Sequence, residues 1–551
     1  MAETLLSPGV LTRENDQSQI TQGPITAGAA IVGQTVKGPV GIPTLVTSYS
    51  SYISKFGGAF VTGGTTQEYL TSISTYNYFQ QGGTSLLVTR VVNGTFLPAS
   101  SSAIVNAVSG GVTPSFALET LSAGNIMNSN GATGSNNSLV SGSADNLRFE
   151  VVGANTGSGT FSLLIRRGND TDNSKVVLES WNNVSLDPNQ PNYIEAVIGN
   201  QSIDVSNGYT NVTGDYTNKS AYVRVKSVTN NTLNYFDNNG TPKTSLTASV
   251  PVNQTGSFGG AAGTLGGVYT LPADAYTSSL NLLANSDEFR YNVITVPGIT
   301  QEASSSAIAL LTTNTSNRGD AIAIIDLVGE TSSLATAVSE ASEIDNSYAA
   351  TYWPWVQVNA PQTGKLTWVP PSTIIPSVFA YNDRVAAPWF APAGFTRGAL
   401  SVIQAKRKLS PTDKDTLYAA NINAIGTFPG QGVVAYGQKT LQKKASALDR
   451  INVRRLLIEL KSYIGQVANT LVFEQNSNAT RNRFLAQTNP YLESIKQREG
   501  LYAYKVVMDD TNNTADVIDR NQLVGQIFVQ PTKTAEFIIL DFNVTPTGAT
   551  F

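Results

Sequence analysis

The apolar residues between positions 26 and 100 follow two different periods, which separate strands from helices. Residues 27–34 (AGAAIVGQ) and 85–92 (SLLVTRVV) are short, almost uninterrupted apolar runs, as expected of buried strands. Between them, a first helix is predicted to begin at Ser48 or Ser50 and to end at Gly57–Gly58. A second helix is predicted by apolar residues at helical spacing, namely Tyr69, Ile73, Tyr76 and Phe79. The order strand, helix, helix, strand predicts the first part of an α/β core over residues 26–100.

The pattern changes sharply at about residue 101. Up to about residue 280, Gly, Ser, Asn and Thr dominate, and helical periodicity disappears. Short alternating runs such as NLRFEVVGAN, TFSLLIRR and AYVRVKSV are separated by loops rich in Asn and Gly. Period-two alternation between turn residues is typical of strands in an all-β domain. Residues 101–280 are therefore predicted to be an all-β domain inserted into the α/β chain.

Strands and helices alternate again from residue 281 to residue 395, which predicts the second part of a doubly wound α/β core. The segment EFRYNVITVPGIT is predicted to be a strand that leads into a tight turn at Pro297–Gly298. The strand AIAIIDL and the helices around it follow. Residues 396–530 are predicted to form an α+β C-terminal domain. It contains a long amphipathic helix from Ile451, a second helix that Pro490 should kink or restart, and closing strands.

Both ends of the chain are predicted to be extended arms. Residues 1–25 are polar, with Pro and Gly as punctuation, and they are too sparsely apolar to form a core. Residues 531–551 contain a last strand, AEFIILDF, followed by a tail that is again extended. Segments of this kind bury little surface by themselves.

Composition narrows the range of functions. Charged residues make up 13% of the 551 residues, about half the usual share, which is typical of surfaces covered by other copies of the same protein. The chain has no cysteine and no histidine, which excludes disulfides, thiolate metal sites and Ser-His-Asp or Cys-His catalysis. Carboxylate or lysine catalysis stays open. The net charge of −4 without a basic block argues against nucleic acid, and no segment is long and apolar enough to predict membrane insertion.

Four local motifs are interpreted as structural. In residues 34–58 the order of Lys37, Gly38 and Pro39 does not match a phosphate-binding loop, and Pro39 lacks an amide donor. The Asp509–Asp510 pair is interpreted as a turn and not as a metal site, and the RGD sequence at 318–320 as a turn before a strand. The aromatic cluster around Trp353 is interpreted as core. No cofactor and no metal are expected.

Several separated segments together resemble the contractile tail sheath proteins of phages and of related injection devices. They are SPGVLTREN (7–15), VGQTVKGPVGIPTLVTSYSSYISKFGG (32–58), VPPS (369–372), AAPWFAPAG (386–394), INAIGTFPGQGVVAYGQKTL (422–441), INVRRLLIELK (451–461) and DDTNNTADVIDRNQLVGQIFVQPTKTAEFIILDF (509–542). The resemblance covers the N-terminal quarter and residues from 287 onward, whereas the insertion has no recognisable counterpart. The N-terminal arm is less acidic than is usual in that family.

The resemblance implies a structural, non-enzymatic subunit that stacks in six-fold rings around a tail tube and contracts without a nucleotide. The arms would add strands to the sheets of neighbouring copies, through Pro8, Gly9, Val10, Phe537, Ile539 and Phe542. The C-terminal domain would face the tube, with Arg454, Arg455, Lys496 and Arg498 as contact residues. Implied partners are further copies of the chain and the tail tube, baseplate and tail terminator proteins. The implied location is the virion tail, assembled in the host bacterial cytoplasm.

Alternative interpretations remain open at this stage. Arg454 and Arg455 also fit a solvated helix face with ion pairs. The whole chain also fits another structural or receptor-binding virion protein, because of its Asn/Ser/Gly-rich insertion, or an α/β hydrolase-like enzyme.

Overall fold

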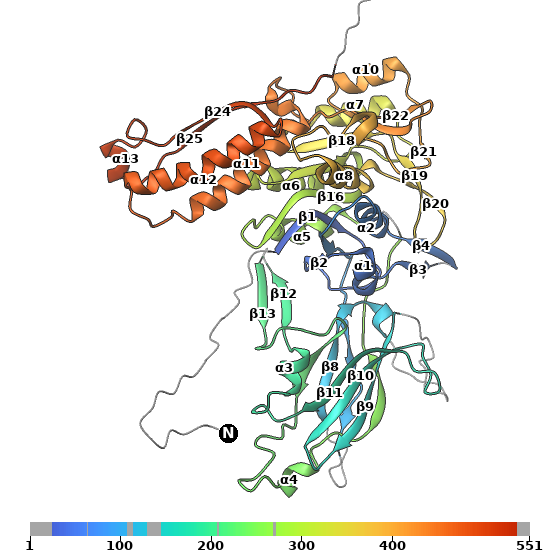
Figure 1. The fold of residues 1–551 in the computed structure, drawn as a ribbon. Coiled ribbons are helices and arrows are strands. Elements are labelled where there is room, and N and C mark those ends of the chain that lie inside the picture. Colours follow the sequence, from blue (N-terminus) through green and yellow to red (C-terminus); the bar gives the residue numbers. More distant parts are fainter. Residues whose placement is uncertain are drawn as a thin grey trace, which may run out of the picture.

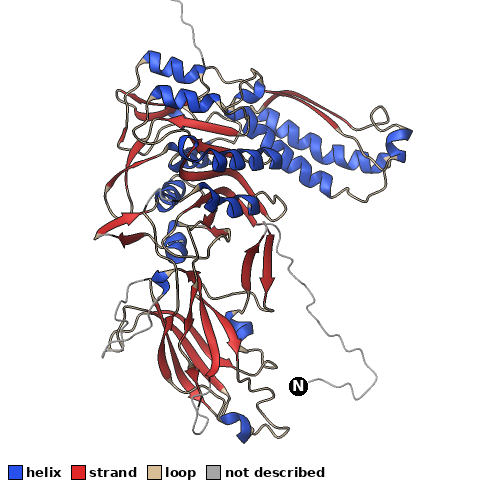
Figure 2. Cartoon of the chain, turned by 180° about the vertical axis from the view of Figure 1, so that it is seen from behind, coloured by secondary structure: helices blue, strands red, loops and turns tan. Residues whose placement is uncertain are grey.

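The computed structural model describes residues 25–62, 64–106, 114–128, 145–206, 209–267 and 271–536. Figure 1 shows an elongated molecule with three parts: a β-rich domain at one end, an α/β core in the middle, and a helical hairpin that projects sideways from the other end. Figure 2, seen from behind, shows that strands dominate the first part and helices dominate the projection.

An eight-stranded sheet forms the centre of the core, in the order β2-β5-β1-β16-β17-β18-β22-β23. Its strands are β1 (Ile25–Gly33), β2 (Thr44–Val46), β5 (Leu86–Arg90), β16 (Phe289–Thr300), β17 (Ile322–Asp326), β18 (Ala349–Trp353), β22 (Asn423–Phe428) and β23 (Gly432–Tyr436). The six inner strands pair in parallel, whereas β2 and β23 are antiparallel at the two edges. Because β22 and β23 belong to this sheet, the sheet takes in residues on both sides of the predicted division at residue 395.

Helices cover both faces of this sheet, as the alternation of strands and helices predicts. One face carries α1 (Tyr49–Phe56), α2 (Leu70–Gln80) and α8 (Ile375–Val385). The other face carries α5 (Thr277–Leu282), α6 (Gln301–Arg318), α7 (Leu334–Ser342) and α10 (Pro411–Ala419). The buried strand β1 serves both layers, because Ala30 and Val32 pack on one face while Ala29 and Ile31 pack on the other.

The predicted ends of α1 are confirmed in detail. The Ser48 hydroxyl accepts a hydrogen bond from the Ser51 amide at 3.1 Å, which satisfies a donor that the first helical turn leaves without a partner. Gly57 ends the helix at φ 74°, in the left-handed region that favours glycine. Strand β16 departs from the prediction, because it runs through Pro297–Gly298 to Thr300 with an irregular register instead of ending in a tight turn.

Two small sheets flank the core. One is the hairpin of β3 (Ala59–Thr62) and β4 (Thr65–Glu68), which the sequence pattern does not predict. The other is a three-stranded sheet in the order β20-β19-β21, made of β19 (Val356–Asn359), β20 (Leu366–Val369) and β21 (Gln404–Ala405).

The inserted domain is built on a second sheet in the order β11-β10-β9-β15-β6-β8-β14, with β7 also paired to β8. Its strands are β6 (Pro98–Ser101), β7 (Ile104–Val105), β8 (Pro114–Ala123), β9 (Leu147–Asn155), β10 (Thr160–Arg167), β11 (Val177–Ser185), β14 (Val223–Val228) and β15 (Gln254–Gly259). A separate hairpin, β12 (Ser202–Ser206) and β13 (Tyr209–Thr213), and the short helices α3 (Ile194–Ile198) and α4 (Thr244–Thr247) complete it. Described neighbouring strands pair antiparallel around a core of their own.

The chain leaves the core for this domain and returns from it at one place. The backbone N–H of Leu97 donates to the carbonyl of Ala262 at 3.0 Å, and the N–H of Ala262 donates back to Leu97 at 3.3 Å. The outgoing and returning segments are therefore hydrogen-bonded to each other.

The loop at residues 34–41 ties this junction to the core. The buried Arg90 side chain donates from Nη1 to the carbonyl oxygens of Gly38 and Ala123, both at 2.7 Å. Lys37 forms an ion pair with Asp145 of the inserted domain at 2.9 Å. Burial lowers the pKa of Arg90 to about 10, because the guanidinium is removed from water. The loop that superficially suggested a phosphate site is thus a structural link between two domains.

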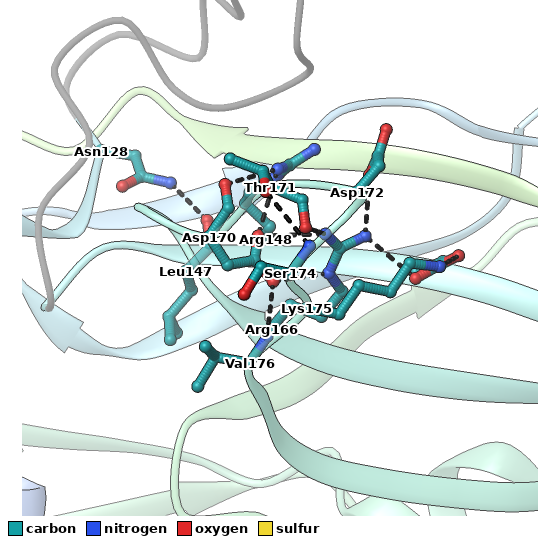
Figure 3. Close-up of polar contacts among 11 residues, drawn as sticks. Asn128, Leu147, Arg148, Arg166, Asp170, Thr171, Asp172, Ser174, Lys175 and Val176 are labelled. Carbon is teal, nitrogen blue, oxygen red and sulfur yellow. Dashed lines mark hydrogen bonds and ion pairs between the residues drawn. The ribbon is translucent and has the colours of Figure 1, made fainter.

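A network of buried charges lies inside the inserted domain (Figure 3). The Arg166 side chain binds Asp170 through Nε at 2.8 Å and through Nη2 at 3.1 Å, and both side chains are completely buried. Its Nη1 also donates to Glu150 at 2.9 Å and to Asp172 at 3.2 Å. Arg148 donates to Asp170 from the other side at 3.2 Å. Charged groups this deep are tolerated because each one has partners.

The projection is a helical hairpin with a two-stranded sheet packed along it (Figure 1). Its elements are α11 (Ile451–Asn469), α12 (Asn478–Gln497), β24 (Leu501–Val507), α13 (Ala515–Asp519) and β25 (Gln526–Pro531). Of the two effects predicted for Pro490, a kink or a restart, the restart is wrong, since α12 continues through this residue. Apolar packing on both sides of the proline, by Phe484 and by Leu492 and Ile495, offsets the loss of one helical hydrogen bond.

Candidate assembly surface

The two-stranded sheet β24–β25 has open edges along both of its sides. Its strands pair antiparallel from Leu501 with Pro531 to Val507 with Gln526, and among the described residues neither strand pairs with a third. The outward backbone N–H and C=O groups of such edges are available to another strand. A long edge of this kind is a ready site for strand addition.

The two faces of this hairpin differ. Tyr504, Val506, Ile527 and Val529 face inward and pack on α11 and α12. On the strand surface away from the helices, Phe528 pairs across the hairpin with Lys505, and Phe528 is 56% exposed. Tyr502 is 63% exposed. Aromatic side chains beside unpaired edges are typical of a surface that a second chain covers.

The last described residue of the chain, Glu536, is anchored on the core. Its carboxylate accepts hydrogen bonds from the Arg450 Nε at 2.7 Å, the Tyr418 hydroxyl at 2.8 Å and the Gln438 amide at 3.0 Å. Burial alone would raise the pKa of Glu536, but the bonds from Gln438, Arg450 and Tyr418 hold it below its usual value. The C-terminal segment therefore leaves the described structure from a fixed point.

The six predicted arm residues, Pro8, Gly9, Val10, Phe537, Ile539 and Phe542, lie outside the described residues. The pairing of the arms therefore stays a prediction. What the described residues contribute is the open hairpin β24–β25 and the anchored segment that ends at Glu536.

Arg454 and Arg455 are buried inside the chain, so the alternative of a solvated helix face is wrong. Arg454 stacks on the ring of Tyr348 at 3.9 Å and donates to the Ser347 hydroxyl at 2.6 Å. Arg455 lies over the ring of Phe379 at 4.6 Å and binds Asp383 at 2.5 Å. Burial lowers the pKa of Arg454. Both side chains connect α11 to the core in this conformation.

Lys496 and Arg498, the other two residues predicted to face the tube, are exposed at the end of α12. Lys496 lies 3.5 Å from Glu493 one turn earlier, and Arg498 stacks on Trp389 at 4.7 Å. Surface pairs of this kind contribute little to stability, so both cations are available to a partner. The tube contact itself stays a prediction.

The motifs interpreted as structural have internal partners. Arg318 of the RGD sequence pairs with Asp320 at 2.9 Å and donates to the Phe289 carbonyl at 2.7 Å, while Gly319 ends α6. Asp509 caps its own turn by accepting from the Thr511 amide at 2.9 Å, which confirms a turn. Trp353 and Trp355 are buried, as predicted.

Among the described residues, no cluster of three or more acidic side chains could hold a metal ion. In the same part of the chain, each helix is too short or too polar to cross a bilayer.

The sequence predicts the strands β24 and β25, but it does not predict that they form a two-stranded sheet with open edges, because the residues of a strand do not specify which other strand pairs with it. It also misses the exposed tip between α11 and α12, where Phe473 is fully exposed at φ 68°. The segment LVFEQNSN, with two large apolar residues directly before a polar turn, was the available signal.

Two family models match adjoining parts of the chain. The phage tail sheath protein central domain matches residues 273–441, and the phage tail sheath C-terminal domain matches residues 443–545. The second match contains the helical hairpin and the open sheet β24–β25.

Curated relatives agree with these matches. The tail sheath protein of Vibrio phage KVP40 is 44% identical over 185 residues, and that of Enterobacteria phage T4 is 42% identical over 185 residues. Each alignment takes in 33% of this chain and 28% of the relative, so the chain matches less than a third of those proteins.

A solved structure extends the similarity to the whole fold. The anti-feeding prophage helical sheath in its contracted state covers 98% of this chain and 99% of its own, with a TM-score of 0.51 at 15% identity. At that identity the likeness concerns the fold alone. The family models and the curated relatives together lead to one assignment: residues 273–441 and 443–545 carry the central and C-terminal domains of phage tail sheath proteins, a family of structural proteins.

Proposed function

We propose that this protein is the subunit of a contractile tail sheath. It polymerises as stacked six-fold rings around a tail tube and contracts by changing the packing between subunits, which drives the tube through the host envelope. The observation that carries the proposal is the open-edged sheet β24–β25, located in the part of the chain that matches the sheath C-terminal domain.

The open edges explain how copies would join. A strand from a neighbouring chain that forms about four backbone hydrogen bonds, each worth about 0.5–1.5 kcal/mol net, would gain about 2–6 kcal/mol. Backbone groups supply this energy, so the pairing places few demands on side chains. An N-terminal arm on one edge and a C-terminal arm on the other would link each subunit to two neighbours.

Pairing through extended arms also suits contraction. A strand-paired link keeps neighbours connected while the compact parts slide and rotate against one another. If the contracted packing buries about 400 Å² more apolar surface per subunit, the gain is about 10 kcal/mol before entropic costs. No nucleotide is needed for a change of this size.

Lys496 and Arg498 support a tube-facing role for the end of α12, because both are exposed cations. Arg454 and Arg455 enter this proposal only through a rearrangement that frees them from Ser347 and Asp383. Baseplate and tail terminator proteins would bind the ends of the polymer. Assembly would take place in the host bacterial cytoplasm, and the assembled sheath would be part of the virion tail.

Truncation tests the proposal. Removal of residues 1–20, or of the residues after Glu536, should leave a folded subunit that no longer polymerises, whereas the full chain should form striated tubes or six-fold rings in negative-stain micrographs. Circular dichroism of each variant checks the fold. Polymers of normal length from both truncated chains would contradict the proposal, as would a full chain that forms neither tubes nor rings.

A further inference from the structure

The outer end of the helical hairpin carries an apolar tip, Val472 and Phe473, in the loop between α11 and α12. Val472 is 57% exposed and Phe473 is fully exposed. Phe473 also has φ 68°, a conformation that costs a bulky side chain energy and calls for an explanation. Beneath the tip, Leu471 and Phe484 belong to a small buried cluster that fixes the loop. The tip is thus an exposed apolar protrusion on a loop that buried side chains hold in place.

A groove of about 480 Å³ lies on the core between α9 (Gly394–Arg397), α10, β23 and the C-terminal segment. Its walls include Ala391, Ile422 and Ala424, together with the half-exposed ring of Tyr436. The Tyr436 ring belongs to an aromatic group, with Phe428 at 4.9 Å and Phe395 at 5.9 Å between ring centroids. An aromatic side chain entering the groove would meet the rings of Tyr418 and Tyr436 and several small apolar side chains, beside charged and polar groups at the rim.

Charge at the two places is complementary. Glu474 follows directly after the tip, and its nearest cation, Arg483, is 3.9 Å away at an exposed position. The groove carries two cations that have no carboxylate partner among the described residues: Arg397 lies over the Phe390 ring and donates to the Ala391 carbonyl at 3.1 Å, and Lys414 lies over the Phe428 and Tyr436 rings. Its own carboxylate Glu536 is occupied by Arg450, which leaves Asp415 as the remaining acid of the wall. An acidic residue beside an aromatic knob therefore suits this groove.

The tip and the groove lie at opposite ends of the upper part of the molecule, as both ribbon views show: α13 and the start of α12 lie on one side, and α10 lies on the other (Figures 1 and 2). One subunit therefore cannot place its own tip in its own groove. A contact between these two different surfaces is head-to-tail, and repetition of such a contact closes a ring or extends a helix.

We infer that the apolar tip of one copy, Val472 and Phe473, inserts into the α9–α10–β23 groove of the next copy. The inference rests on the proposed function insofar as copies must polymerise. It adds a second, side-chain-specific contact that is independent of strand addition by the arms. A ring of subunits joined by both contacts would have one flexible link and one rigid link at each junction.

Cysteine cross-linking tests this contact cleanly, because the chain has no cysteine of its own. Phe473→Cys and Tyr436→Cys chains are mixed, polymerised and treated with a short bismaleimide. A cross-linked dimer is expected, with residue 473 joined to residue 436 in the mass spectrum. A mixture of Phe473→Cys with Val177→Cys, whose residue 177 is exposed on the inserted domain, is the control and should give no dimer.

Polymerisation of single variants gives a second readout. Phe473→Glu is expected to raise the critical concentration for polymer formation about tenfold or more, in line with loss of a buried aromatic anchor. Leu233→Ser, which removes an exposed apolar side chain of the inserted domain, should leave it unchanged.

Normal polymers of Phe473→Glu together with no 473–436 cross-link would overturn the inference while leaving the proposed function intact. A cross-link from residue 473 to the C-terminal residues after 536, or to a tube protein, would also overturn it. If the wild-type chain forms no polymer at all, the proposed function fails, and the inference fails with it.

Discussion

Replacement of Arg166 by methionine is expected to reduce the free energy of unfolding of the inserted domain by about 3–5 kcal/mol. The guanidinium makes bonds to three carboxylates, and Asp170 is completely buried beside it. Methionine has a similar length and keeps the apolar packing, but it donates no hydrogen bond. Asp170 would then keep only Arg148 at 3.2 Å and the Val176 amide at 2.9 Å as charge-stabilising partners. The buried, charged Asp170 carboxylate would then have too few hydrogen-bonding partners, and this accounts for the loss of stability.

The expected change is large enough to measure by calorimetry. For a domain of this size, each kcal/mol corresponds to about 2–4 °C, so the melting temperature of the inserted domain should fall by about 6–20 °C. The matched control is Arg520→Met, because Arg520 also pairs with an aspartate, Asp516, at 2.8 Å but both side chains are exposed. That change should cost less than about 1 kcal/mol.

A double variant isolates the mechanism. If the penalty comes from an isolated buried carboxylate, Arg166→Met combined with Asp170→Asn should cost clearly less than the sum of the two single changes. Additive losses, or a loss for Arg166→Met no larger than that for Arg520→Met, would refute the reasoning from burial.

Three further changes test other parts of the structure. Asp326 is fully buried, and desolvation raises its pKa to about 7 although Ser372 donates a hydrogen bond to it. The folded state therefore binds a proton more tightly than the unfolded state, in which the pKa of this carboxyl is near 3.8. The free energy of unfolding should fall by up to about 4 kcal/mol as the pH rises from about 4 to 7. Asp326→Asn should remove this part of the pH dependence, and pH-resolved melting curves identical to the wild type would contradict the assignment. Gly38→Ala should destabilise the domain junction by more than about 1–3 kcal/mol, because φ at this residue is 110° and an added Cβ would lie 2.6 Å from the Phe56 ring. Gly41→Ala should reduce the free energy of unfolding by only about 1–2 kcal/mol, because its φ is 71° but no atom lies within 4 Å of an added Cβ. Equal denaturant midpoints for these two variants would show that the contact with Phe56 is not limiting. Arg455→Ala should reduce the free energy of chemical unfolding by about 1–3 kcal/mol, because Asp383 loses its buried partner. The control Arg483→Ala should be nearly neutral, because Arg483 and Glu474 form an exposed pair at 3.9 Å. A neutral Arg455→Ala would argue against a role of Arg455 in holding α11 on the core.

Local features of the fold were predictable because they depend on neighbouring residues. The Ser48 cap, the Gly57 stop and the apolar runs of β1 and β5 are determined within a few positions of the chain. The pairing of β22 with β18 was not predictable in this way, since it joins Asn423 to Tyr352 across a long connection. Alternation of strands and helices identified the layers, but not which strand stands at the edge.

The candidate surface shows the same division. The amphipathic pattern of α11 placed Arg454 and Arg455 off the apolar stripe, and this suggested an exposed face. The helix is instead covered by Tyr348 and Phe379 on that side, so long cationic side chains are buried through stacking. Burial of these two arginines depends on which aromatic rings the rest of the fold places beside α11, and the periodicity of the helix sequence cannot predict that.

The backbone pairing of Leu97 with Ala262 makes the inserted domain an exchangeable unit. Since the two connecting segments already run side by side, everything between them could be swapped for a tight two-residue turn, or for foreign cargo with adjacent termini, without altering a single strand of the central sheet. A lineage could therefore replace the inserted domain repeatedly while the central sheet stayed the same, and an engineer could exchange it by the same route.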